Sequence, residues 1–323
     1  APVGSMLKKD GDPYTVFTPF KNNGFKIKID KPSKIRTKNL TKSNKLKTQD
    51  YIKYNINKNI LVNGGRKNGL KQLKKLKDQK KYNANRNTLS IETSLLSAYI
   101  KFGCISIREV YWKVKDKLGT SNSLLSQLFW REFYFYIAYY FPQVLKGKNY
   151  NEKYNNLEWN KSKSKFTKWC NGETGYPVVD AGMREMNETG YMHNRARLIT
   201  SNFLNRMLGM DWREGEKYFA TMLTDYDPSV NNGNWQWIAS TGTDPKPYFQ
   251  RLFNPIIQSE KFDKQAEYIK KWIPELKDVP AKDIHKWESK YKDYDVNELH
   301  YFKPIVEYKK ARAASVKMYR EVL

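Results

Sequence analysis

Residues 225–255 read DYDPSVNNGNWQWIASTGTDPKPYFQRLFNP, and this stretch holds the most informative pattern in the chain. Two acids, Asp225 and Asp227, flank a tyrosine, a pair of asparagines precedes a glycine, and two tryptophans lie two residues apart. The simplest local interpretation of the acids is a helix C-terminus that runs into a turn at Pro228. Packing of an ordinary helical core does not select acids, amides and indoles together, so the neighbouring residues favour a functional site.

The overall composition predicts a soluble protein that is neither secreted nor membrane-bound. The chain has 323 residues, enough for about two domains, and 39% of them are hydrophobic. No apolar run approaches the ~20 residues that span a bilayer, and no signal peptide is evident. Two unpaired cysteines and three histidines argue against a disulfide framework and against a metal site. Residues 1–5, before Met6, resemble a cloning remnant, and we expect a cytoplasmic or nuclear, DNA-associated location.

Positive charge is concentrated near the N-terminus. Residues 1–90 contain 23 Lys and Arg against 5 Asp and Glu, a net charge of +18 out of +26 for the chain. A Lys- and Asn-rich run of this kind is typical of a solvated linker, and contact with nucleic acid is the alternative. The remaining residues are still basic enough to attract a polyanion through counterion release.

The hydrophobic pattern divides the chain into a connector and a helical region. Residues 21–87 have glycine interruptions and only weak helical spacing, which predicts a long connector with one or two short helices. After Leu89, apolar residues recur at helical spacing almost to the C-terminus. Predicted helices cover residues 91–102, 107–118, 124–141, 179–189, 195–208 and 212–223, and the basic tail is predicted to end in another helix. The predicted class is therefore mostly α-helical.

The segment 225–255 closely resembles the flavin-binding stretch of the DNA photolyase/cryptochrome family. The resemblance is strong over residues 88–280 and implies a helical FAD-binding catalytic domain over residues 88–323. Residues 11–20 resemble the last strand and exit of the family's α/β antenna domain. We therefore expect residues 1–20 to combine the cloning remnant with the end of that domain, 21–87 to form the connector, and the chain to hold no antenna chromophore. A separately encoded antenna domain is an expected partner.

Thr93 to Ser97 could hold a phosphate at the start of a helix, although Ser and Thr also begin many helices as ordinary caps. The sequence TSLLS looks like the motif with which the family binds the FAD pyrophosphate. The resemblance implies that Arg197 pairs with Asp225 beside the flavin, that Asp227 bonds the polar edge of the ring, and that Asn231 faces N5. The implied cofactor residues are Tyr82, Thr93, Ser94, Leu96, Ser97, Arg131, Arg197, Asp225, Asp227 and Asn231.

Tryptophans are most often core or anchoring residues, but three of them match a family pattern. Trp235 matches the flavin-proximal member of an electron-transfer relay, Trp212 the middle member and Trp159 the member nearest solvent. The resemblance implies that an electron moves along these indoles to reduce the flavin.

The substrate side of the resemblance is less complete. Trp130, Tyr191, Asn194, Arg195 and Trp237 match positions that contact the damaged strand or receive a flipped pyrimidine dimer. Gln127, assigned a catalytic and DNA-binding role, stands where class I cyclobutane-dimer photolyases carry a Glu, so the usual stabilisation is weakened. Asn194 and Leu198 replace the two histidines that (6-4) photolyases need, which removes the acid for that chemistry.

These matches predict light-driven repair of cyclobutane pyrimidine dimers by electron transfer from reduced FAD, with damaged DNA as the partner. A cryptochrome-like photoreceptor and a degenerate protein that only binds DNA or a partner are the alternatives. Dimer turnover under light separates all three.

Overall fold

The computed structural model describes residues 2–33, 57–244 and 246–323. These residues form a helical fold, and their only recorded β-pairing is an isolated bridge between Leu7 and Pro13. The predicted helical class is confirmed. Within the described residues, no helix combines the length and apolarity needed to cross a membrane.

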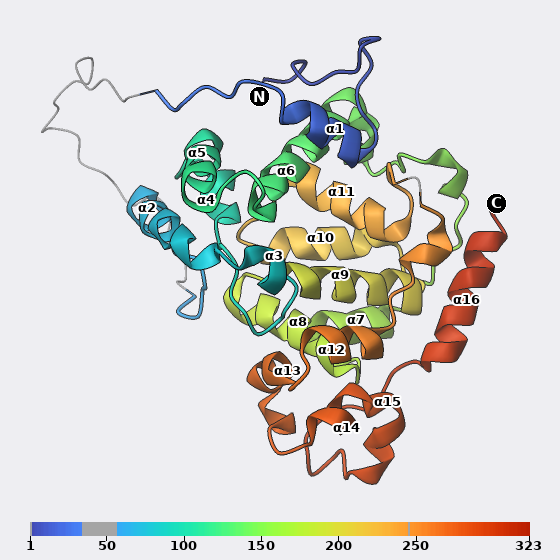
Figure 1. The fold of residues 1–323 in the computed structure, drawn as a ribbon. Coiled ribbons are helices and arrows are strands. Elements are labelled where there is room, and N and C mark those ends of the chain that lie inside the picture. Colours follow the sequence, from blue (N-terminus) through green and yellow to red (C-terminus); the bar gives the residue numbers. More distant parts are fainter. Residues whose placement is uncertain (1, 34–56, 245) are drawn as a thin grey trace, which may run out of the picture.

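The α-helices and shorter helical turns follow one another without an intervening sheet (Figure 1). In chain order they are α1 (Phe17–Gly24), α2 (Arg66–Lys74), η2 (Lys75–Gln79), α3 (Tyr82–Asn85), α4 (Ser97–Lys101), α5 (Ile107–Leu118), α6 (Ser123–Tyr140), η3 (Pro142–Lys146), η4 (Glu152–Tyr154), α7 (Lys163–Asn171), α8 (Pro177–Thr189), α9 (Asn194–Asn202), the π-helical η5 (Phe203–Met207), α10 (Trp212–Met222), α11 (Pro228–Ala239), η6 (Tyr248–Arg251), α12 (Pro255–Phe262), α13 (Glu267–Trp272), η7 (Pro274–Leu276), α14 (Ala281–His285), α15 (Trp287–Lys290), η8 (Tyr291–Asp293) and α16 (Tyr308–Arg320).

Local sequence explains several helix ends. Ser106 and Glu109 form a capping box at the start of α5, and Asp211 caps α10 as predicted. Asp227 accepts hydrogen bonds from Ser229 N and Val230 N at the start of α11. The local interpretation of these acids as a helix C-terminus is therefore wrong, because Asp227 begins the next helix.

Two large hydrophobic clusters hold most of the helices together, and a third, small one is formed by Tyr154, Leu157, Tyr248 and Tyr319. The larger contains the apolar sides of α8, α9 and α10 with Trp235 from α11, and the smaller joins α1, η2, α5 and α6. In Figure 1, α9, α10 and α11 lie one above another in the centre, with α6 and α1 above them and α12 to α15 below. The functional cavity lies between helices of the larger cluster, such as α9, and helices of the smaller cluster, such as α6.

The N-terminal part differs from the prediction. Residues 11–20 contain no strand, and helix α1 crosses the expected boundary at residue 20. Phe17 stacks on Trp130 with ring centroids 3.5 Å apart, and Phe20 is fully buried. The strand prediction is wrong because the apolar residues of this segment pack as one helical face against α6.

The described part of the predicted connector is also packed. Val62, Leu73 and Leu76 are buried in the smaller cluster, so residues 57–87 are not simply a solvated linker. The basic residues 34–56 lie outside the described residues.

Two predicted helices have different bounds. The helix expected from residue 91 begins only at Ser97, because Leu95 has φ of 48° and cannot continue a right-handed helix. The helix expected over 195–208 changes to π-helical geometry from Phe203 to Met207. The predicted C-terminal helix is confirmed as α16.

Helices α10 and α11 approach each other closely at Gly215. A Cβ at Gly215 in α10 would overlap the Trp235 indole and the Leu204 side chain. Gly215→Ala should therefore lower the free energy of unfolding by about 1–3 kcal/mol through overpacking. Gly64→Ala is the control, because a Cβ there meets no atom within 4 Å. Denaturant unfolding of both variants measures the effect, and equal stability would show that α10 and α11 can separate at little cost.

Candidate functional site

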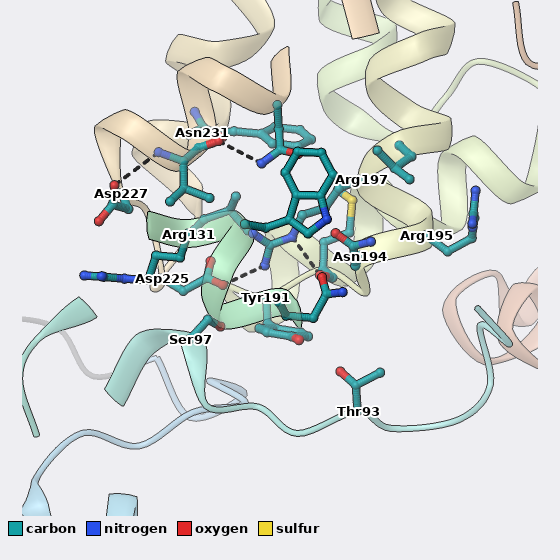
Figure 2. Close-up of a pocket in the computed structure, with 18 of the residues that line it drawn as sticks. Thr93, Ser97, Arg131, Tyr191, Asn194, Arg195, Arg197, Asp225, Asp227 and Asn231 are labelled. Atoms are coloured by element: carbon teal, nitrogen blue, oxygen red, sulfur yellow. Dashed lines mark hydrogen bonds and ion pairs between the residues drawn. The ribbon is translucent and has the colours of Figure 1, made fainter. Parts of the chain in front are cut away.

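A cavity of about 490 Å³ lies between α3, α4 and α6 on one side and α9, α11 and the α10–α11 loop on the other. This volume is within the range of ~300–1,000 Å³ common for small-molecule and cofactor sites. Figure 2 shows that Thr93 lies across the cavity from Asp227 and Asn231. The space is therefore bounded by segments far apart in the sequence.

The cavity brings together almost every predicted site residue. All the predicted cofactor residues and all the predicted DNA contacts line it, together with Trp235. Trp212 and Trp159 lie outside it. Their assigned roles remain predictions, but the placement shows that the two predicted sets share one space.

Residues 93–97 form an irregular loop at one end of the cavity. Leu95 has a left-handed backbone conformation, which for a bulky residue persists only where surrounding structure enforces it. Gln72 from α2 donates a hydrogen bond to the Ser94 carbonyl at 3.0 Å and so fixes the loop from behind. Leu96 is the N-cap residue of α4 and makes no side-chain cap bond. The alternative that the Ser and Thr hydroxyls simply cap this helix is therefore wrong.

Arg197 and Asp225 form an ion pair on the opposite wall, as predicted (Figure 2). Arg197 Nη2 lies 3.0 Å from Asp225 Oδ2, and Arg197 Nε donates to the Met192 carbonyl at 2.8 Å. The Asp225 side chain is only 5% exposed, and its Oδ1 is buried without a hydrogen-bond partner. A buried acceptor of this kind is costly unless a donor reaches it, so it fits a ligand that brings an N–H or O–H group.

Asp227 uses its two oxygens differently. Oδ1 caps α11, whereas Oδ2 lies 3.7 Å from Lys101 Nζ. This distance is longer than that of a direct hydrogen bond, so Oδ2 can still accept one from a ligand.

Glu216, which has no recognisable signal in the sequence, holds the Asn231 side chain. Asn231 Nδ2 donates to the Glu216 carbonyl at 3.1 Å and to Glu216 Oε1 at 3.0 Å. Both amide protons are thus engaged, and Asn231 has only its Oδ1 acceptor to present to a ligand. Burial raises the pKa of Glu216, and the hydrogen bonds from Asn231 and Tyr226 partly oppose this shift.

The rim of the cavity carries exposed polar and cationic groups. Asn194 is exposed, and the Arg195 guanidinium lies 4.3 Å from the Phe262 ring centre. Arg195 Nη2 donates to Asn87 Oδ1 at 2.7 Å, which holds the side chain in place. Burial lowers the pKa of Arg195, and the charge of nearby Arg86 adds to this effect. Arg86, which also lines the cavity, is a second cation that suits an anionic partner.

The charged residues of the lining are mostly basic. Arg86, Lys101, Arg131, Arg195 and Arg197 stand against Asp225 and Asp227. This excess of positive charge fits a flavin dinucleotide, whose pyrophosphate is anionic, and the polar wall at Asp225 to Asn231 fits the donors and acceptors of its ring. Lys101 and Glu216 had no recognisable signal in the sequence, because each acquires its partner only through folding.

Of the three tryptophans predicted to form a relay, two are buried and one is partly exposed. Trp235 is buried, with ring contacts to Phe219 at 5.0 Å and to Trp169 at 6.3 Å. Trp212 is buried and donates from its indole to Asn149 Oδ1 at 3.1 Å, whereas Trp159 is partly exposed. All three belong to or pack against the larger hydrophobic cluster. The relay through these three residues stays a prediction.

Comparison with known proteins gives consistent matches. A family model described as the FAD binding domain of DNA photolyase matches residues 124–321. The chain is 42% identical over 289 residues to a deoxyribodipyrimidine photo-lyase of Alkalihalophilus pseudofirmus, covering 85% of this chain and 60% of that protein. It is 37% identical over 332 residues to the Escherichia coli deoxyribodipyrimidine photo-lyase, covering 98% of this chain and 70% of that protein.

Solved structures match over nearly the whole chain. A class III photolyase from Agrobacterium tumefaciens has a TM-score of 0.84 at 33% identity, covering 100% of this chain and 71% of that one. An archaeal photolyase from Sulfolobus tokodaii, solved with two FAD molecules, has a TM-score of 0.80 at 38% identity, covering 98% and 70%. A Synechocystis cryptochrome has a TM-score of 0.80 at 30% identity, covering 95% and 68%.

The cap of α9 generates a prediction about pH. His193 Nδ1 accepts a hydrogen bond from Arg195 N, and burial, with the charges of Arg195 and Arg197, lowers the pKa of His193 to about 4. The unfolded chain therefore binds more protons than the folded one between pH ~6.5 and about 4, and stability falls as the pH falls through this window.

We expect His193→Asn, which keeps a cap acceptor but cannot titrate, to lose less stability than the parent between pH 7 and pH 4.5. The difference between the two proteins should approach about 3 kcal/mol at most. The free energy of unfolding of each protein is measured at both pH values. The effect of titrating other groups, such as Glu185, is common to both proteins and cancels in the comparison. Parallel losses would show that folding does not lower the pKa of His193.

Proposed function

Because the chain belongs to the DNA photolyase/cryptochrome family and carries its FAD-binding domain, we propose that it repairs cyclobutane pyrimidine dimers in DNA in a light-driven reaction. The observation that supports this proposal is that one cavity is lined both by the residues predicted to bind flavin and by those predicted to contact damaged bases. The chain spans 60% of the length of the Alkalihalophilus relative. The proposed activity therefore rests on the residues that line the cavity.

Residues on two walls would hold FAD. The loop from Thr93 to Ser97, with Tyr82 beside it, would receive the pyrophosphate, where backbone N–H groups and nearby cations favour negative charge. On the far wall, Asp227 Oδ2 would accept from the ring, and Asn231 would present Oδ1 because Glu216 occupies its amide protons. When bound and reduced, FAD supplies the electron that splits the dimer under light.

The arginine and acid beside the ring would set its electrostatic surroundings. Arg197 remains paired with Asp225, so the wall offers a fixed ion pair together with a buried acceptor. Such preorganised groups need little rearrangement when charge moves during the reaction.

The predicted relay would restore the reduced cofactor. Trp235 lines the cavity, Trp212 is buried in the same hydrophobic cluster, and the partly exposed Trp159 would exchange electrons with a reductant in solvent. The helix packing around Gly215 supports this function by holding the Trp235 indole in one position.

The substrate residues stand at the same opening. Trp130, backed by Phe17, and Trp237 offer aromatic surfaces for an unstacked base, while Asn194 and Arg195 would contact the strand at the rim. The Arg195 guanidinium is already positioned by Asn87 and Phe262, which reduces the entropy lost when phosphate binds. Gln127 would donate a neutral hydrogen bond to the dimer from α6.

Removing the Asp227 carboxylate tests the flavin site. Asp227→Ala should lose FAD, because the ring loses its acceptor and α11 loses its cap. Asp211→Ala is the matched control, since it removes the cap of α10 at a residue outside the cavity lining. Flavin absorbance per protein after gel filtration is the measurement. Full flavin retention by a folded Asp227→Ala protein would reject the proposed ring position.

Gln127 tests the repair reaction itself. An amide in place of a carboxyl group should lose ~1–2 kcal/mol of stabilisation for the developing negative charge, a roughly fivefold to thirtyfold loss of rate. Gln127→Glu should therefore raise dimer splitting per absorbed photon at saturating DNA while the flavin spectrum stays nearly unchanged. Gln143→Glu, which adds the same charge on η3 outside the cavity lining, controls for general repulsion of DNA.

If the parent and Gln127→Glu both bind FAD but neither splits dimers, the repair proposal fails. Light-dependent flavin reduction without turnover would then favour a cryptochrome-like photoreceptor, and one structural neighbour, from Synechocystis, is named a cryptochrome. Absence of flavin in both would favour a protein that only binds DNA or a partner.

A further inference from the structure

Lys101 is the last residue of α4 and lines the cavity, yet nothing in the sequence pattern marked it. It follows Ser97 by four residues, so both project from the same side of a single helical turn. Its side chain is 29% exposed, and its Nζ lies 3.7 Å from Asp227 Oδ2. Helix α4 thus carries one residue predicted to meet the FAD phosphate and one that faces the acid predicted to meet the flavin ring.

The two acids of the cavity differ in what offsets their charge. Asp225 has Arg197 at hydrogen-bonding distance. Asp227, whose side chain is 9% exposed, has Lys101 as its only ion-pair partner among the described residues. Its other contacts are the backbone N–H groups of Ser229 and Val230, which bear no net charge.

If no cation offset the charge of Asp227, the effect would be largest on a reduced flavin. Two-electron reduction at neutral pH leaves the flavin ring with more negative charge than the oxidised ring. A carboxylate without a cation beside that ring would oppose reduction, and the opposition is strong in a cavity where water is partly excluded. A nearby ammonium group reverses this effect, since opposite charges in low dielectric attract more strongly than in bulk water.

We propose that Lys101 is a positioning residue that holds the Asp227 carboxylate and offsets its charge, so that the cavity favours reduced over oxidised FAD. This proposal rests on the proposed flavin site and deepens it, because it assigns control of the cofactor's redox state to a residue outside the predicted set. It also explains why the cavity tolerates two acids on one wall: each has its own cation.

A purely structural role for the pair makes a different prediction. A partly exposed ion pair contributes little to stability, and loss of such a pair alters both redox states of a bound ligand equally. A change in the ratio of reduced to oxidised FAD at fixed potential is therefore the informative readout, since it depends only on differential stabilisation.

The experiment compares Lys101→Met, which keeps most of the aliphatic stem, with Lys101→Arg, which keeps the charge. Each protein is loaded with FAD and titrated with a redox dye of known potential in the dark. Lys101→Met should show about a tenfold lower ratio of reduced to oxidised FAD at a fixed potential, equal to about 30 mV for a two-electron couple. Lys101→Arg should remain within about twofold of the parent. Lys74→Met, on an exposed residue of α2 outside the cavity lining, controls for the loss of one positive charge.

Each outcome is decisive. An unchanged ratio in Lys101→Met overturns the role of Lys101 while leaving the flavin site intact. The same conclusion follows if Lys101→Arg and Lys74→Met lower the ratio as much as Lys101→Met does. If Lys101→Met binds too little FAD to titrate, the dissociation constants of oxidised and reduced FAD are measured separately, and equal weakening of both overturns the proposal. Failure of the parent itself to bind FAD contradicts the proposed function instead.

Discussion

The buried pairing of Arg197 with Asp225 sets the character of the whole cavity. A carboxylate that is 5% exposed needs a cation and hydrogen-bond donors, and Arg197 supplies both from α9 while Met192 fixes its other side. The pair joins α9 to the loop before α11 and leaves Asp225 Oδ1 without a partner. Removal of Arg197 would leave the buried Asp225 carboxylate without its cation, so α9, the loop before α11 and the site depend on each other. Stability and ligand recognition are therefore not separable at this wall.

Helix α11 is the element on which the other functional features depend. It begins at the Asp227 cap, carries Asn231 one turn later, and presents Trp235 and Trp237 after that. Its position is fixed by close approach on two sides, since Gly215 of α10 lies against Trp235 and Gly233 of α11 lies against the Tyr134 ring. Side chains larger than glycine at these contacts would move the acids, the amide and the indoles together. One helix thus couples the wall proposed to meet the flavin, the start of the predicted relay and part of the proposed substrate opening.

The sequence supported the helical class and most helix positions because apolar spacing and caps are local signals, as at Ser106 and Asp211. It failed at Leu95, where a left-handed residue ends a plausible helical pattern, and at Phe17, whose partner Trp130 lies more than a hundred residues away. The predicted site residues came from a family resemblance and not from spacing alone. Glu216, Lys101 and Asn87 escaped notice because their importance arises from contacts with Asn231, Asp227 and Arg195 that only the folded chain creates.

The central claim is that one cavity holds FAD with its phosphates at the loop of residues 93–97 and its ring against α11. The most direct test is a crystal structure of the protein saturated with FAD. We predict pyrophosphate oxygens within hydrogen-bonding distance of Thr93 to Ser97, and the polar edge of the ring against Asp227 and Asn231. FAD bound in the opposite direction, or outside this cavity, would contradict the account.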